Sequence, residues 1–115
     1  MPYMDYTLKD LPQDVRELAL SAVRTLAERG PRGLVEDGLC PPEAEDSFVE
    51  NRNLYPGKLI EPPDSAELDY YIRANGIWRI DIPLHNDVEG RIDLFIFLEV
   101  DPQARSVKVT GLYTP

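Results

Sequence analysis

The spacing of apolar residues predicts a helix near the start of the chain. Between about Pro12 and Arg29, apolar side chains recur every three or four positions and form one stripe, composed of Leu11, Val15, Leu18, Ala19, Ala22, Val23, Leu26 and Ala27. This period is typical of an amphipathic helix that packs on a core. Pro12 suits the first helical turn, and Arg29-Gly30-Pro31 is a stop signal.

The middle of the chain, from Pro31 to Pro63, contains too many prolines and glycines for long elements. Two short helical turns are expected there, over residues 32–37 and 42–53. Glu43, Glu45 and Asp46 fall in the first turn of the second one, where the helix dipole favours negative charge. Some of the acidic residues of this segment therefore have a purely structural explanation.

In the C-terminal half the apolar period changes to two, which indicates strands. Residues 68–73 and 77–84 are expected to pair around Asn75-Gly76, a dipeptide that favours tight hairpin turns. Trp78 then shares one face of the second strand with Ile80, Ile82 and Leu84. Residues 85–90 are expected to form a loop, and residues 91–100 and 106–113 two further strands.

Together these patterns predict a single α+β domain over residues 1–115. An N-terminal amphipathic helix (11–30) packs on a four-stranded antiparallel β-meander (68–114), and an acidic, proline-rich segment with short helical turns (31–67) connects them. The length suits one core and not two.

The third expected strand carries apolar side chains on both faces. Phe95 and Phe97 lie opposite the Ile92–Val100 stripe, and one helix covers only one face of a sheet. The two rings therefore need other cover, from the middle segment, from a pocket or from a partner chain. The middle segment is the favoured source.

The net charge of −9 is concentrated in one segment. Residues 36–69 hold ten acids against Arg52 and Lys58, a balance of −8, whereas residues 1–35 sum to 0 and residues 70–115 to −1. Nucleic-acid binding is disfavoured, and a basic protein partner is expected. The residues expected to bind it are Glu36, Asp37, Glu43, Glu45, Asp46, Glu50, Tyr55, Asp64, Glu67 and Asp69.

Cysteine usage and hydropathy favour the cytoplasm. The single cysteine, Cys40, excludes an intrachain disulfide. The sequence Met1–Tyr6 lacks the basic start and apolar run of a signal peptide, and no apolar stretch approaches the roughly 20 residues that cross a bilayer. We therefore expect neither export nor a membrane span.

No strong catalytic or metal-binding motif occurs in the sequence. His85, Asp87, Glu89 and Asp93 have a spacing that could present ligands to a divalent metal, but turns between strands are rich in such residues for geometric reasons. Cys40 has acidic neighbours, which oppose the thiolate form that a nucleophile needs. The sequence therefore predicts no catalytic residue, no metal and no cofactor.

The C-terminal half resembles a family of small bacterial domains. The shared features are a tryptophan that leads a strand, a proline-leucine step, an acidic loop ending in Glu-Gly-Arg, and Asp-Leu before a long apolar strand; here these are Trp78, Pro83-Leu84, Glu89-Gly90-Arg91 and Asp93-Leu94. The resemblance implies an immunity-protein-like domain. A helix on a curved meander is also similar to cystatin-like and NTF2-like architectures.

Three functions remain open at this point. The leading hypothesis is a non-enzymatic bacterial immunity protein or antitoxin, which neutralises a toxin through its acidic surface. The second is an NTF2-like small-molecule-binding or catalytic domain, with Tyr70 and Trp78 as pocket walls and His85 or Asp93 as polar groups. The third is a homodimer that pairs through Phe95 and Phe97.

Overall fold

The first helix forms where the apolar stripe predicts it. In the computed structural model, which describes residues 6–115, helix α1 spans Gln13–Glu36 and is interrupted at Gly30, whose φ of 72° lies outside the helical region. A short turn of 3₁₀ helix, η1 (Leu8–Asp10), precedes it. The stop signal and the helical turn expected over residues 32–37 are both confirmed, because the chain bends at Gly30 and continues as helix from Pro31. Within residues 6–115, no helix has the length and apolar content needed to cross a membrane.

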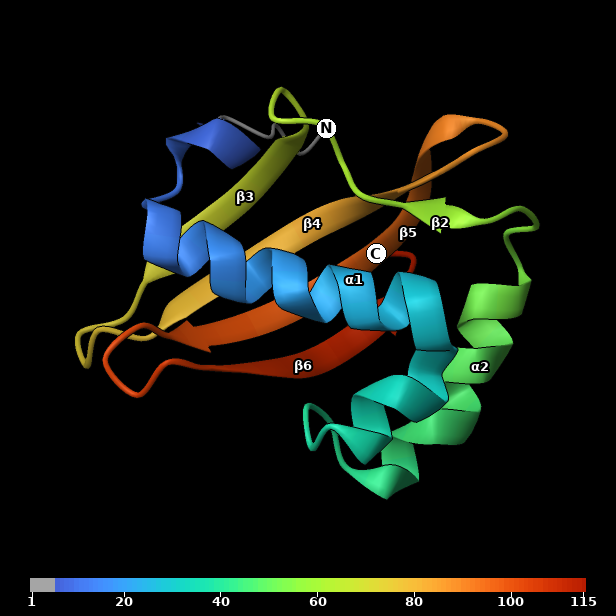
Figure 1. Cartoon of the computed structure of the whole chain (residues 1–115), viewed down its shortest axis with the longest axis horizontal. Helices are drawn as coiled ribbons and strands as arrows, with labels where there is room; N and C mark the ends of the chain where they lie inside the picture. The colour runs from blue at the N-terminus through green and yellow to red at the C-terminus, as the bar shows by residue number, and fades with distance from the viewer. Residues whose placement is uncertain (1–5) are drawn as a thin grey trace.

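The second expected helical turn is also confirmed. A 3₁₀ turn, η2 (Pro42–Ala44), leads directly into helix α2 (Glu45–Asn53). Phe48 is the one buried side chain of α2 and anchors it to the main core. The helix packs beside α1 and the end of the sheet (Figure 1).

The sheet is antiparallel throughout and contains the expected meander. Strands β3 (Glu67–Ile72), β4 (Trp78–Asn86), β5 (Gly90–Asp101) and β6 (Ser106–Tyr113) pair in chain order. Two short strands enlarge it: β1 (Tyr6–Thr7) pairs with β3, and β2 (Leu59–Ile60) pairs with β4. The expected count of four strands is therefore wrong, since the described sheet has six. Two-residue strands are too short to show an alternating pattern in the sequence.

The first hairpin forms around Asn75-Gly76 as predicted. Gly76 has a φ of 84°, and the Arg73 amide donates a hydrogen bond of 2.9 Å to the Ile77 carbonyl. The connection expected over residues 85–90 is present but shorter, a turn of residues 87–89, because β4 extends to Asn86 and β5 begins at Gly90.

Asn86 explains why this second turn is so short. Its side chain is buried, donates to the Pro56 carbonyl at 3.0 Å, and accepts the Val88 and Glu89 amides at 3.1 and 2.7 Å. Hydrogen bonds of this kind replace those that a longer loop would make to water.

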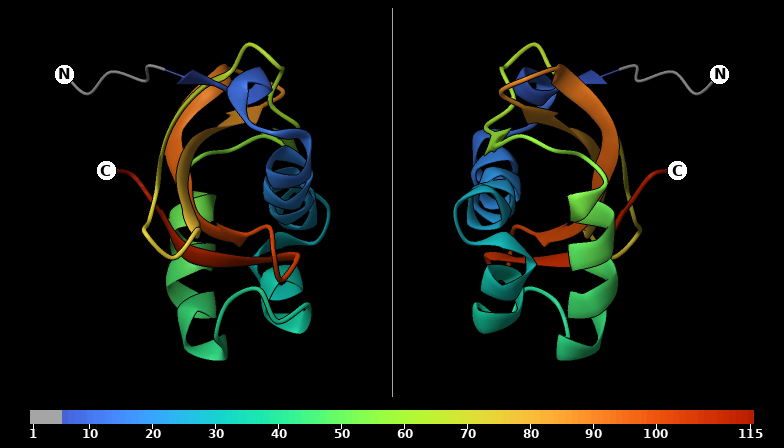
Figure 2. Two further views of the ribbon diagram at one scale, coloured as in Figure 1. Left: turned by 90° about the vertical axis from the view of Figure 1, so that its left-hand side faces the viewer. Right: turned by 90° about the vertical axis from the view of Figure 1, so that its right-hand side faces the viewer.

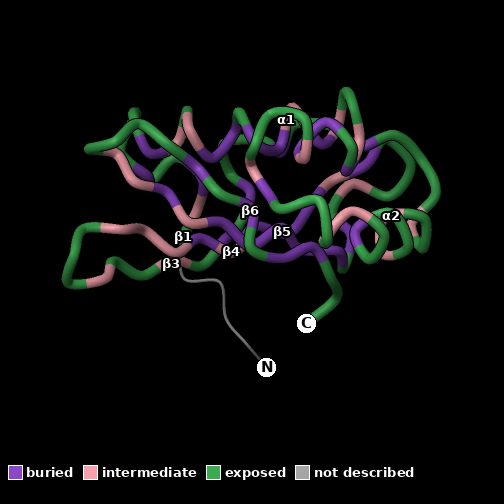
Figure 3. Tube along the Cα trace, turned by 90° about the horizontal axis from the view of Figure 1, so that it is seen from below, coloured by how far each residue is buried: buried purple, intermediate pink, exposed green. Residues whose placement is uncertain are grey.

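The core fills the space between α1 and the concave side of the sheet (Figures 2 and 3). Trp78 leads the helix-facing row of β4, as expected, and the side chains behind it are fully buried. The core side chains with no more than 2 % exposure include Val15, Val23, Leu26, Leu68, Ile80, Ile82, Leu84, Leu94, Ile96, Leu98, Val100 and Leu112.

Helix α2 and the connection that precedes it cover part of the edge of β6. The Leu39 carbonyl accepts the Val109 amide at 2.7 Å, and the Asn51 side chain donates to the Leu112 carbonyl at 2.8 Å. These bonds satisfy edge groups that would otherwise attract another strand, and they fix the position of α2 relative to the sheet.

Candidate interaction surfaces

The acids of residues 36–69 lie in two separate places (Figure 1). Glu36 and Asp37 end α1, and Glu43, Glu45, Asp46 and Glu50 belong to η2 and α2 at the same end of the molecule. Asp64, Glu67 and Asp69 lie in and before β3, on the far side of the sheet from α2. The residues proposed from the sequence therefore do not form one patch.

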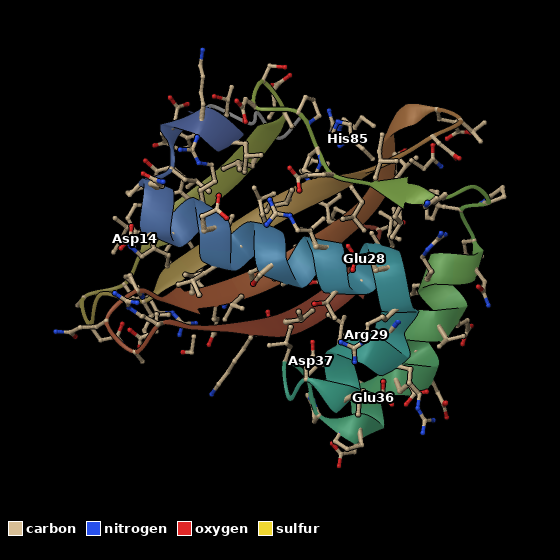
Figure 4. All side chains as sticks on the ribbon, in the orientation of Figure 1. Asp14, Glu28, Arg29, Glu36, Asp37 and His85 are labelled. Atoms are coloured by element: carbon tan, nitrogen blue, oxygen red, sulfur yellow. The ribbon has the colours of Figure 1, made fainter. Side chains whose placement is uncertain are left out.

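Arginine side chains offset half of the acids near α2. Arg29 points between the two acids at the end of α1 (Figure 4), at 3.0 Å from Asp37 and 3.2 Å from Glu36. Hydrogen bonds to Asp37 and then Glu36 raise the pKa of Arg29. Arg32 lies 3.8 Å from Glu45. These three acids therefore form ion pairs at the end of α1.

The remaining three acids form what we call the α2 acidic face: Glu43, Asp46 and Glu50, together with Val49. All are exposed, and the three carboxylates make no ion pair with any residue in the described range 6–115. Asp46 and Glu50 stand four residues apart on one helix face, where like charges repel. Glu50 also lies toward the negative end of the helix dipole.

Tyr55 makes its contacts within the fold. It is half-buried against the core, and its hydroxyl shares a hydrogen bond of 2.6 Å with the hydroxyl of Thr114. Its structural role is to tie the end of α2 to the chain after β6.

A second surface is the outer sheet face, which points away from α1. Phe95 and Phe97 lie there, only 7 % and 9 % exposed. The Tyr113 ring stacks on Phe97 at a centroid distance of 4.4 Å, and the Arg91 guanidinium lies 6.0 Å from the centre of the Phe95 ring. These covering contacts come from β5 and β6, whereas the sequence favours cover by the middle segment.

Gly111 makes the aromatic stacking feasible. A Cβ atom on this residue would lie 2.7 Å from the Tyr113 ring and 3.2 Å from the Phe97 ring. The absence of a side chain leaves room for the two rings to lie across the backbone of β6.

Two carboxylates stand directly opposite each other beside these rings. The strand register pairs Asp69 with Asp81, then Asp81 with Phe97, then Phe97 with Gly111. Asp81 is partly buried, and within the described structure its carboxylate forms neither a hydrogen bond nor an ion pair. Burial raises the pKa of Asp81, Arg79 opposes this effect, and Asp69 adds to it.

The nearest bases are held elsewhere. Glu99 lies 3.2 Å from Arg73 and 3.6 Å from Arg79. Both guanidinium groups therefore pair with Glu99, on the outer face beside the Asp81–Phe97 pair, and not with Asp81. Among residues 6–115, neither Asp69 nor Asp81 forms an ion pair, and Arg79 acts on Asp81 only through its nearby charge.

The residues proposed to line a pocket do not come together. Tyr70 stacks on Trp78 at 5.0 Å and on Tyr6 at 4.2 Å, on the helix-facing side of the sheet. His85 and Asp93 belong to the outer face (Figure 4 shows His85). Fully buried side chains occupy the space between α1 and the sheet, where an NTF2-like pocket would lie.

His85 is a strand residue with an unusual environment. Its Nδ1 atom is buried without a hydrogen-bond partner in the part of the chain that the structure describes. Burial lowers the pKa of His85; the Pro83 backbone opposes this shift, and the nearby Arg91 adds to it. No group of three or more His, Cys, Asp or Glu side chains among residues 6–115 is arranged to hold a metal ion.

Cys40 is unsuited to nucleophilic chemistry. It is 7 % exposed, and burial together with the charge of Glu45 raises the pKa of its thiol. A thiol in such a site stays protonated at neutral pH.

No family model matches the chain, and no significant similarity to a curated protein or a solved structure was found. The interaction surfaces therefore have to be judged on their own geometry.

Sequence reasoning missed Asp81, Gly111 and Tyr113. A two-residue turn at Asn75-Gly76 would pair Asp69 with Ile82. The hairpin instead has a three-residue loop, residues 74–76, which shifts the register by one position and places Asp69 opposite Asp81. The contact between Tyr113 and Phe97 depends on an irregularity in the β5–β6 pairing between Phe97 and Leu98, for which the sequence offers no clear signal.

Proposed function

We propose that the protein is a non-enzymatic binding domain, an immunity protein or antitoxin of the bacterial cytoplasm, which neutralises a basic protein through the α2 acidic face. The observation that carries the proposal is the set of three exposed carboxylates, Glu43, Asp46 and Glu50, that no base in residues 6–115 offsets.

The charges of this face are costly in the free protein. Each like-charge pair four residues apart destabilises a helix by about 0.2–0.5 kcal/mol. Asp46 lies in the first turn of α2, where the dipole compensates it, but Glu50 has no such compensation. A basic partner would remove the repulsion and would be steered toward this end of the molecule.

Val49 supplies an apolar contact beside the charges. Its side chain is 37 % exposed and follows Asp46 by three residues, so it flanks the pair formed by Asp46 and Glu50 on the surface of α2. Interfaces of moderate size commonly surround such apolar contacts with polar residues. Because α2 is fixed to the core by Phe48 and to β6 by Asn51, the face is held rigidly before binding.

The test is co-expression with the product of the adjacent gene, followed by growth measurement and affinity measurement on the purified pair. The proposal predicts that the wild-type protein restores growth and that Asp46→Lys/Glu50→Lys does not, while both proteins unfold at similar denaturant concentrations. Equal rescue by the charge-reversed variant would overturn the proposal.

A further inference from the structure

The outer sheet face combines unbalanced charge with aromatic surface, and α1 packs on the opposite face of the sheet (Figure 2). Asp69 and Asp81 stand opposite each other on β3 and β4, and Phe97 follows on β5. Neighbouring strands are about 4.8 Å apart, so a group bonded to Asp81 lies beside the Phe97 ring.

We propose that this face docks an arginine-bearing segment of a basic protein partner, with the guanidinium group between Asp69 and Asp81 and against the stack of Phe97 and Tyr113. The proposal rests on the proposed function for the class of partner, and it assigns a second contact surface far from α2.

Charge complementarity selects a cation at this position. Like charges directly opposite across two antiparallel strands repel each other. Asp69 accepts a hydrogen bond only from the adjacent Tyr70 amide, at 3.0 Å, and Asp81 accepts none within residues 6–115. Five charged residues surround the pair on this face: Glu67, which precedes Asp69 by two positions on β3, Arg73 and Arg79, which both pair with Glu99, Glu99 itself, and Lys108, which stands opposite Glu99.

The aromatic rings select arginine over lysine. A guanidinium group is planar and weakly hydrated, stacks on aromatic rings and donates to two carboxylates at once, whereas an ammonium group is a compact and strongly hydrated charge. The same face already holds one such contact, since Arg91 lies over Phe95 at 6.0 Å. Gly111 lets the adjoining rings of Phe97 and Tyr113 lie close against the backbone of β6.

The test is an NMR titration of the full chain with N-acetyl-arginine methylamide, with the lysine and citrulline analogues as controls for planarity and charge. We expect arginine to shift the Gly111 amide and the Phe97 and Tyr113 ring signals, lysine to bind more weakly, and citrulline to leave these signals unchanged. Loss of one charge-assisted hydrogen bond should make Asp81→Asn bind arginine roughly 10-fold more weakly.

Asp93→Asn is the matched control, because Asp93 is an exposed acid of β5 outside the row from Asp69 to Gly111. It should retain wild-type affinity for the arginine probe. Equal affinity of Asp81→Asn and wild type, or equal shifts with citrulline, would overturn the inference.

The outcome also separates the inference from the proposed function. Shifts confined to the amides of Asp46 and Glu50 would overturn the outer-face site and leave the α2 acidic face intact. Shifts at Gly111, with rescue of growth unaffected by charge reversal on α2, would support the outer-face site and overturn the role of α2. An absence of shifts at Gly111, Phe97 and Tyr113 would overturn the inference.

Discussion

Asp81 provides a sharp test because its charge is unfavourable in the free protein. Removing that charge should therefore stabilise the fold when no partner is bound. Asp81→Asn keeps the shape of the side chain and removes a partly buried charge that faces Asp69. Directly opposed like charges cost roughly 0.2–1 kcal/mol in a sheet. Because solvent screens a partly exposed pair, we expect the free energy of unfolding to rise by about 0.5 kcal/mol at neutral pH.

The pH dependence of this gain follows from the raised pKa of Asp81. The folded chain holds the Asp81 proton more tightly than the unfolded chain, so the wild type loses stability as pH rises from about 3.9 through the folded pKa. The advantage of Asp81→Asn should therefore be complete above this window and absent below it.

The assay is urea and thermal unfolding of wild type and Asp81→Asn across this pH window, with a gain in melting temperature of about 2 °C expected at neutral pH. Added salt should narrow the difference because it screens the repulsion. In a double-mutant cycle with Asp69→Asn, the double variant should gain less than the sum of the single gains. A destabilised Asp81→Asn, or a gain independent of pH, would refute the reasoning.

Three further predictions concern the fold. Gly111→Ala should displace the Tyr113 ring from Phe97, destabilise the protein by about 1 kcal/mol and weaken the near-ultraviolet circular dichroism; an unchanged spectrum would contradict the stacking. Asn86→Ala removes three hydrogen bonds from a buried side chain and should cost about 2–3 kcal/mol in denaturant unfolding, whereas a cost below about 1 kcal/mol would show that water replaces them. The lowered pKa of His85 means that the unfolded chain binds its proton more readily, so stability should fall as pH drops through about 6.5 toward the folded pKa. His85→Gln should flatten that part of the profile, and an unchanged slope would assign it to other groups.

The fold was largely predictable because its main elements have strong local signals. These signals are set by residues close together in the sequence: the apolar stripe of α1, the break at Gly30-Pro31 and the Asn75-Gly76 turn. The short strands β1 and β2 were missed because pairing with β3 and β4, and not their own sequence, makes them strands. Asn86 was assigned to a loop because its burial depends on Pro56, thirty positions earlier in the chain.

The candidate surfaces were predictable in charge but not in position. Composition locates the acids between residues 36 and 69, but only folding shows that Arg29 and Arg32 pair with Glu36, Asp37 and Glu45. The acids fall into two groups, because the chain crosses from α2 through β2 to β3 between Glu50 and Asp64. Charge that stays unpaired after folding therefore locates a candidate surface better than the net charge of a sequence segment does.

The most direct test of the central claim compares two matched pairs of charge removals in the complex with the basic partner. Asp46→Asn/Glu50→Gln removes one aspartate and one glutamate from the α2 acidic face. Asp14→Asn/Glu28→Gln removes the same two charges from α1, where both side chains are exposed and lie outside both proposed contact surfaces. We predict that affinity, measured by calorimetry over a range of salt concentrations, falls and loses salt dependence in the first variant alone. Equal losses in both variants, or a loss only in the second, would contradict the claim.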